Sequence, residues 1–113
     1  MKYYYVYILT CADNSFYTGM TNNLDRRLKD HSEGVDPKSY TFKRRPVIMA
    51  ASFEFNNIFY AISFEKQIKR WSRAKKKALI KGDYELLSEL SKRYRDMVKS
   101  DDGSIVRQAH YSP

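Results

Sequence analysis

A short stretch of the chain, Tyr17 to His31, holds three residues whose side chains suit proton transfer or phosphate binding. Tyr17 is expected in a strand, and Arg27 and His31 in the helix that follows it. At about 100° per residue, both fall on the helix face that also carries Leu24 and Leu28. Because the two leucines would anchor this face to a sheet, Arg27 and His31 are expected at the edge of the core, near Tyr17. A guanidinium can bind phosphate oxygens, and phenol and imidazole groups can move a proton.

The elements that would position this stretch follow from periodicity and turn residues. We expect strands at 3–10, 16–21 and 47–55, a loop at 35–46, and helices at 23–33, 57–72, 73–81 and 84–99. Helix starts are expected at Asn22 or Asn23, Ser72 and Asp83, and helix ends at Gly34 and Gly82. The predicted fold class is therefore α+β, with a small three-stranded antiparallel sheet flanked by helices and an extra C-terminal helix.

The strand at 3–10 has apolar or amphipathic side chains on both faces, so we expect it at the centre of the sheet. The strand at 16–21 should pair with it as a hairpin, which brings Tyr7 near Tyr17. Whether these two side chains share a face depends on the register, which the sequence leaves open.

Apolar stripes indicate how two of the helices pack. The helix at 57–72 has a stripe of Ala61, Phe64, Ile68 and Trp71, with Glu65 on its shoulder, about 80° from the centre. The helix at 84–99 has an expected buried side of Leu86, Leu87, Leu90, Tyr94 and Met97. These stripes place Trp71 in the core rather than on a surface that could stack on a base.

Composition narrows the class of protein and the kind of partner. The 113 residues fit one domain, and 21 Lys and Arg against 13 Asp and Glu give a formal net charge of +8. Such a balance favours nucleic acid as the partner, with an acidic membrane surface as the second choice. The single Cys11 excludes an internal disulfide. No signal peptide and no run of ~20 apolar residues is visible, so we expect a cytoplasmic location with no membrane partner.

Positive charge gathers in two segments, the loop at 35–46 and the region from Lys66 to Lys81, which holds no acidic residue. The candidate nucleic-acid-binding residues are Lys43, Arg44, Arg45, Lys66, Lys69, Arg70, Arg73, Lys75, Lys76 and Lys77. We expect them to contact the phosphate backbone, which positions a strand without reading its sequence. The alternative is that Lys75 to Lys77 form an ordinary solvated face.

Two tyrosine motifs and the residues after them resemble a known family. Tyr5-Val6-Tyr7 and Tyr17-Thr18-Gly19 lie ten residues apart, Arg27 and His31 follow, and Glu65 begins the basic segment EKQIKRWSRAKKKALI. Over about residues 3–82 the chain resembles a GIY-YIG domain, most closely the small stand-alone GIY-YIG proteins of bacteria.

The resemblance implies a GIY-YIG fold and cleavage of a DNA phosphodiester with one Mg²⁺ or Mn²⁺. Glu65 would hold the metal, and Arg27 would bind the phosphate. Tyr7 or Tyr17 would deprotonate the attacking water while the other orients it, and His31 would relay a proton or fix the geometry. The implied domain is 1–82, with a helix at 83–99 packed on it and a flexible tail at 100–113. By the same analogy the substrate is structured or damaged DNA, as in DNA repair, with a protein partner that supplies specificity.

Each site residue also has an ordinary explanation when it is taken alone. Tyr7 could simply pack in the sheet, Arg27 could pair with a neighbouring acid, and Glu65 could pair with Lys69 one turn later. Two other functions stay open on the sequence: a nucleic-acid-binding module with weak or lost catalysis, and a small adaptor that binds another protein.

Overall fold

The computed structural model describes residues 2–98. The elements are β1 (Tyr4–Thr10), β2 (Phe16–Thr21), α1 (Leu24–Glu33), a 3₁₀ turn (Phe42–Arg44), β3 (Ile48–Phe55), α2 (Ile58–Lys69), α3 (Arg73–Lys81) and α4 (Tyr84–Val98). The three antiparallel strands and the helices confirm the predicted α+β class. The chain forms two compact units, Met1–Glu65 and Lys66–Pro113. The division predicted at residue 82 stays a prediction, and the predicted tail at 100–113 lies outside the described residues.

The sheet belongs to the first unit, and β1 is its central strand, as predicted, with the order β2-β1-β3. The register that the sequence left open pairs Tyr7 with Gly19 and Leu9 with Tyr17. Directly paired residues lie on the same face of a sheet, and so do residues two apart on one strand. Tyr7 and Tyr17 are therefore diagonal neighbours on one face.

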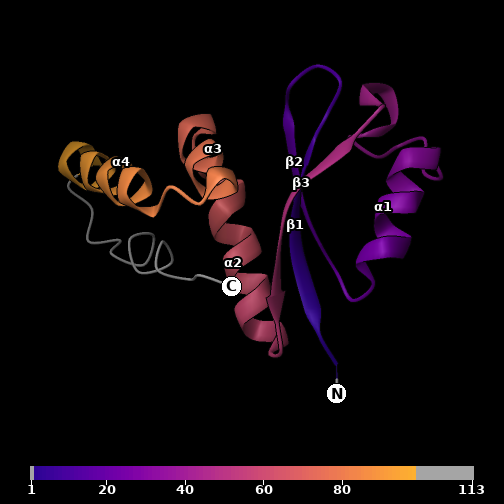
Figure 1. The fold of residues 1–113 in the computed structure, drawn as a ribbon, viewed down its shortest axis with the longest axis horizontal. Helices are drawn as coiled ribbons and strands as arrows, with labels where there is room; N and C mark the ends of the chain where they lie inside the picture. Colours follow the sequence, from indigo (N-terminus) through magenta and orange to yellow (C-terminus); the bar gives the residue numbers. More distant parts are fainter. Residues whose placement is uncertain (1, 99–113) are drawn as a thin grey trace. The chain divides into compact units, whose positions relative to one another are not determined.

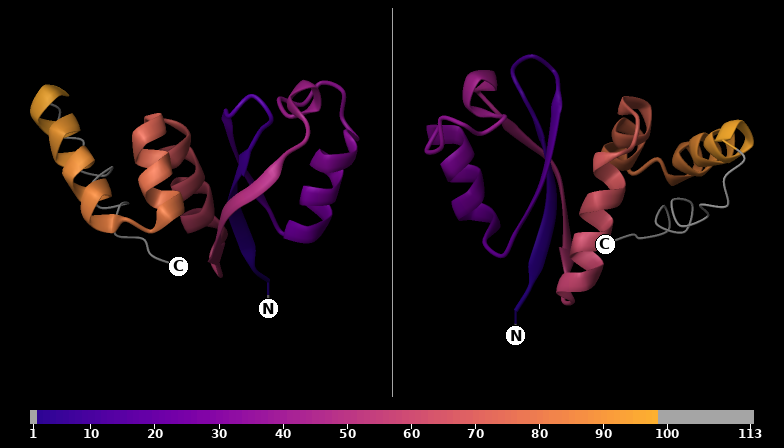
Figure 2. Two further views of the ribbon diagram at one scale, coloured as in Figure 1. Left: turned by 45° about the horizontal axis from the view of Figure 1, so that its top comes forward. Right: turned by 180° about the vertical axis from the view of Figure 1, so that it is seen from behind.

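Helices cover both faces of this sheet. α1 lies against one face, and the first turns of α2 run along the other (Figures 1 and 2). The ring of Phe64 on α2 contacts Phe53 and Phe55 of β3, with centroids 5.2 and 5.4 Å apart. Since Phe53 pairs with Val6, these rings occupy the face opposite to Tyr7. The face with Tyr7 and Tyr17 is thus left for the side chains of α1.

The second unit contains the end of α2, α3 and α4, and its helix boundaries follow the predicted caps. Ser72 accepts a hydrogen bond from the Lys75 amide, and Gly82 adopts the left-handed conformation after α3. Asp83 accepts a hydrogen bond from the Leu86 amide and so caps α4. α2 ends at Lys69 rather than at residue 72, because the chain turns before the Ser72 cap.

The predicted buried side of α4 is partly wrong. Leu87 is fully buried, but Leu86 is 44% exposed. Ser91 is also fully buried, and it lies one turn after Leu87. The buried face therefore runs along Leu87 and Ser91, and Leu86 is turned about 100° away from it. The side chains of Tyr94 and Met97 lie outside the described residues.

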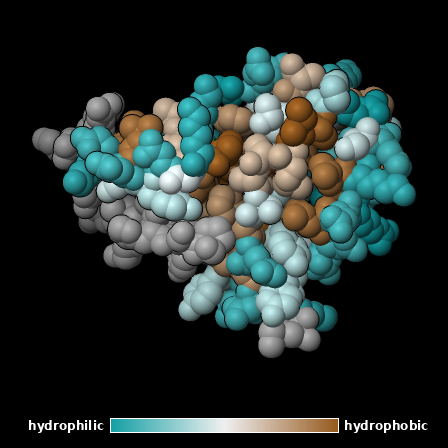
Figure 3. Space-filling view, in the orientation of Figure 1, coloured by the Kyte–Doolittle hydropathy of each residue, from teal (hydrophilic) through white to brown (hydrophobic). Residues whose placement is uncertain are grey.

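On the face seen in Figure 3, hydrophilic side chains lie toward the edges and a group of hydrophobic side chains lies near the middle. None of the helices in the described part of the chain has the length and apolar character needed to cross a membrane.

Candidate active site

Tyr7 fills a space that exists only because its sheet partner has no side chain. A Cβ added to Gly19 would lie 2.4 Å from the Tyr7 hydroxyl oxygen and 2.5 Å from Cζ, closer than real contacts allow. The backbone of Gly19 itself requires no unusual dihedral angle. The glycine of the second tyrosine motif is therefore explained by packing, since it lets the phenol of Tyr7 lie flat over β2.

α1 is fixed at both ends, which sets the position of its polar face. Asn23 caps the start by accepting a hydrogen bond from the Arg26 amide, and Gly34 ends the helix in the left-handed conformation. The guanidinium of Arg45 lies against Gly34 and donates to the Phe42 carbonyl oxygen at 2.9 Å. The end of α1 is thereby held to the loop that follows it.

His31, in the last turn of α1, is the centre of the buried polar contacts. Its Nε2 lies 3.0 Å from the Tyr7 hydroxyl oxygen, and its Nδ1 lies 2.7 Å from Oγ1 of Thr41. Its ring centroid lies 5.9 Å from that of Tyr7 and 5.1 Å from that of Tyr17. Both ring nitrogens of His31 therefore have hydrogen-bond partners within the protein.

The charges of Arg27 and Glu65 act on Tyr7. Burial raises the pKa of Tyr7 well above its ordinary value, and the negative charges of an ionised Tyr17 and of Glu65 act in the same direction. The Arg27 guanidinium lowers this pKa through its charge and through a hydrogen bond. The buried phenol is therefore protonated at neutral pH, with a cation and a carboxylate acting on the same oxygen.

His31 is shifted in the opposite sense. Burial lowers the pKa of His31, the positive charge of Arg27 lowers it further, and Asp30 opposes both effects. The imidazole is consequently neutral at pH 7, so one ring nitrogen is free of a proton. A neutral imidazole beside a protonated phenol forms a donor–acceptor pair.

Of the five predicted catalytic residues, Tyr7, Tyr17 and His31 lie in contact in the first unit, and the catalytic roles of all five stay predictions. The rings of Tyr7, Tyr17 and His31 contact one another, and Arg27 and Glu65 act on the Tyr7 oxygen. Within residues 2–98, no group of three or more His, Cys, Asp and Glu side chains could hold a metal ion. Glu65 is the carboxylate whose charge acts on Tyr7. One carboxylate suits Mg²⁺, which keeps most of its waters and uses few protein ligands.

The loop between α1 and β3 contributes residues that the sequence analysis did not single out. Tyr40 stacks on Tyr17 with centroids 6.0 Å apart, and the Arg44 guanidinium lies 3.8 Å from the centre of the Tyr40 ring. Arg44 also forms an ion pair with Asp13 at 3.2 Å. The loop is thereby attached to the β1–β2 turn beside the site. In the sequence analysis this segment was a candidate only for its positive charges at Lys43, Arg44 and Arg45, and Tyr40 was not named.

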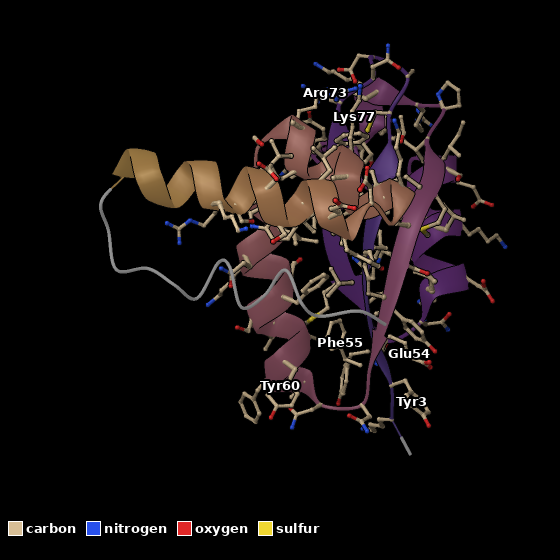
Figure 4. The ribbon with its side chains drawn as sticks, turned by 60° about the vertical axis from the view of Figure 1, so that its left-hand side comes forward. Tyr3, Glu54, Phe55, Tyr60, Arg73 and Lys77 are labelled. Atoms are coloured by element: carbon tan, nitrogen blue, oxygen red, sulfur yellow. The ribbon has the colours of Figure 1, made fainter. Side chains whose placement is uncertain are left out.

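The predicted nucleic-acid-binding residues divide into engaged and exposed side chains. Lys75 is the clearest exception to the prediction: it is 6% exposed, and its ammonium lies 4.5 Å from the centre of the Trp71 ring. It is a packing residue and does not face solvent. Lys76 is half-buried, and Arg44 and Arg45 make the contacts described above. The exposed members are Lys43 and Arg45 in the first unit and Lys66, Lys69, Arg70, Arg73 and Lys77 in the second. Arg73 and Lys77 lie side by side on α3 (Figure 4).

Fold and site together define a domain in which two tyrosine motifs on neighbouring strands meet a helix with an arginine and a histidine. The chain belongs to the GIY-YIG family: the model of the GIY-YIG catalytic domain matches residues 3–78. This is a nuclease family whose members act on nucleic acid and generally use divalent metal ions.

Relatives match most of this chain. The UPF0213 protein BH0048 of Halalkalibacterium halodurans is 42% identical over 91 residues, which cover 78% of this chain and 96% of the relative. The UPF0213 protein CPE1444 of Clostridium perfringens is 47% identical over 76 residues, covering 67% and 81%. The solution NMR structure of the protein EF2693 from E. faecalis is similar with a TM-score of 0.54 and 36% identity, covering 74% of this chain and 88% of that one.

Proposed function

We propose that this protein is a metal-dependent endonuclease that hydrolyses phosphodiester bonds of structured or damaged DNA, with a role in DNA repair. The observation that carries the proposal is the buried contact between the Tyr7 hydroxyl and Nε2 of His31, with Arg27 and Glu65 acting on the same phenol oxygen. A phenol that only packs in a sheet needs one hydrogen-bond partner, but it needs neither a cation nor a carboxylate whose charge acts on it.

Tyr7 is the better of the two tyrosines for the general base, because it is the one whose hydroxyl is joined to a proton acceptor. Because the pKa of Tyr7 is raised, its hydroxyl is protonated before the reaction. It takes a proton from the attacking water while its own proton passes to Nε2 of His31, so that the histidine holds the positive charge. The water oxygen forms a bond to phosphorus, the bond to the leaving oxygen breaks, and that oxygen takes a proton from solvent.

Arg27 and Tyr17 position the reactants. The guanidinium donates two hydrogen bonds to phosphate oxygens and offsets the charge that develops on them. Tyr17 is half-buried beside His31 and stacked on Tyr40, so its hydroxyl is held near that of Tyr7 and can orient the water.

Glu65 would hold one divalent cation, Mg²⁺ or Mn²⁺. Its half-buried carboxylate is a hard oxygen ligand close enough to act on Tyr7. When bound, the metal supplies charge neutralisation at the phosphate and the leaving oxygen.

The exposed cations would bind the DNA backbone. Lys43 and Arg45 lie on the loop, and the five exposed cations of the second unit lie in the segment from Lys66 to Lys81, which holds no acidic residue. Contacts of this kind do not read a sequence. Recognition would therefore come from the shape of the DNA or from a protein partner.

The test is cleavage of labelled duplex, nicked, flap and four-way branched DNA with Mg²⁺, with Mn²⁺ and with EDTA. We expect metal-dependent cutting, strongest on a branched or nicked substrate. Binding that weakens with salt but no cutting on any substrate would instead support a binding module. An affinity for DNA that does not change with salt would support the protein-binding adaptor.

A further inference from the structure

The hydroxyl of Thr41 is the second partner of His31, and it comes from a loop residue outside both tyrosine motifs. Thr41 is fully buried, and its Oγ1 lies 2.7 Å from Nδ1 of His31. The same oxygen lies 3.2 Å from Oγ of Ser39. A buried chain of polar contacts therefore runs from Tyr7 through His31 and Thr41 to Ser39.

We propose that Thr41 is a positioning residue, which holds His31 in the tautomer with a proton on Nδ1 and so leaves Nε2 open to receive a proton from Tyr7. This inference rests on the proposed function for its catalytic consequence, whereas the tautomer itself can be observed without any substrate.

The direction of the hydrogen bonds follows from the donors available. The positive charge of Arg27 acts on the Tyr7 oxygen, and a guanidinium can only donate hydrogen bonds. The buried Tyr7 hydroxyl needs an acceptor for its own proton, and Nε2 of His31 at 3.0 Å is placed to be that acceptor. A neutral imidazole that accepts at Nε2 carries its proton on Nδ1. This proton is donated to Thr41, whose own hydroxyl proton is then directed to Ser39.

The opposite tautomer leaves one group without a suitable partner. With a proton on Nε2, His31 would donate to the Tyr7 oxygen, and the buried Tyr7 hydroxyl would need another acceptor for its own proton. An unpaired polar group in the interior is costly. Thr41 accepts the proton at the other end of the ring and thereby favours the productive tautomer.

Other functional groups near His31 cannot take this role. Tyr7 and Tyr17 lie on the Nε2 side and on the ring face, and Arg27 and Asp30 lie on the same helix as the histidine. Thr41 is held in place from both sides, by the stacking of Tyr40 on Tyr17 and by the Arg45 contact with Phe42. The attached loop thus brings a fixed acceptor to Nδ1.

The test compares Thr41→Val with two reference variants. Valine keeps the shape of threonine without the hydroxyl, and Thr41→Ser keeps the hydroxyl without the methyl group. Thr18→Val is the matched control because Thr18 is also buried, at 4% exposed, and its Oγ1 meets no hydrogen-bond partner among residues 2–98. All variants are measured in full-length protein.

The first measurement is the ¹⁵N spectrum of the imidazole nitrogens at neutral pH, with His31→Gln to assign the signals. We expect the Nδ1–H tautomer in the wild type, in Thr41→Ser and in Thr18→Val, and a shift toward Nε2–H in Thr41→Val. The second is metal-dependent cleavage, which should fall at least about tenfold in Thr41→Val, within the ~10²-fold or larger contribution of a positioned acid–base group. Thr41→Ser should restore most of the rate.

An Nε2–H tautomer in the wild type, or an unchanged tautomer in Thr41→Val, would overturn the proposal. So would a Thr41→Ser variant as inactive as Thr41→Val. If Thr41→Val does not fold, the wild-type and Thr41→Ser spectra still decide the tautomer. If the wild type cuts no DNA, the proposed function fails, but the spectra still test whether Thr41 sets the state of His31.

Discussion

Replacement of Gly19 by alanine tests whether the position of the Tyr7 hydroxyl matters for cleavage. The added Cβ would lie 2.4 Å from that oxygen, and ordinary contact begins at 3.4 Å. The phenol must therefore move by about 1 Å (3.4 − 2.4). The Tyr7 hydroxyl now lies 3.0 Å from Nε2 of His31, and a displacement of this size disrupts the length or the angle of that hydrogen bond.

Two effects of different size are expected from this substitution. An extra methyl group in a packed interior costs about 1–3 kcal/mol, which lowers Tm by at least about 4 °C in a domain of this size. A misplacement of about 1 Å at a reacting group costs about 10²-fold in rate. Thermal unfolding by circular dichroism and cleavage at a temperature where the variant remains folded measure the two effects separately.

Gly82→Ala is the matched control for the loss of stability. Gly82 has a φ of +72°, and no atom lies within 4 Å of an added Cβ. Alanine there costs about 1–2 kcal/mol of backbone strain and touches no site residue. We expect Gly82→Ala to be destabilised but to cut DNA at the wild-type rate. A Gly19→Ala variant that cuts as fast as the Gly82→Ala control would refute the role given to the Tyr7 hydroxyl.

Three further predictions concern charge. Glu65→Gln should abolish metal-dependent cutting while salt-dependent DNA binding, measured by fluorescence anisotropy, stays intact; equal cutting would remove Glu65 from the mechanism. Lys77→Ala should reduce the slope of log affinity against log salt by about 1, with little change in Tm. Lys75→Ala should instead lower Tm and leave that slope unchanged, because its side chain packs on Trp71. Burial lowers the pKa of His31, so the unfolded chain binds more protons below pH ~6.5 and stability falls as the pH drops. Tm should therefore fall less between pH 7 and pH 5 in His31→Gln than in the wild type.

Local sequence signals predicted the elements well because they act within one turn of a helix. Asn23, Ser72 and Asp83 cap helices through their own neighbours, and Gly34 and Gly82 end them in the left-handed conformation. Each of these effects depends on a few adjacent residues and requires no knowledge of the tertiary structure.

Contacts between distant segments were not predictable in the same way. Thr41 meets His31 only because the loop after α1 is attached to Tyr17 and to Asp13. No periodicity within the loop signals these contacts. The burial of Lys75 could have been found, since it lies four residues after Trp71 and four before Leu79 on the buried side of α3. Its charge led instead to the prediction that it faces solvent.

The buried Tyr7 joins the stability of the sheet to the proposed chemistry. Tyr7 is almost fully buried and its hydroxyl meets Nε2 of His31, so this contact stabilises the sheet. In the proposed mechanism His31 is also the proton acceptor, and Arg27, whose charge acts on the Tyr7 oxygen, binds the phosphate. A substitution that removes His31 is therefore expected to lower both stability and cleavage, whereas loss of an exposed cation weakens binding alone. The two kinds of substitution therefore distinguish the role of the site residues from the role of the exposed cations on α3.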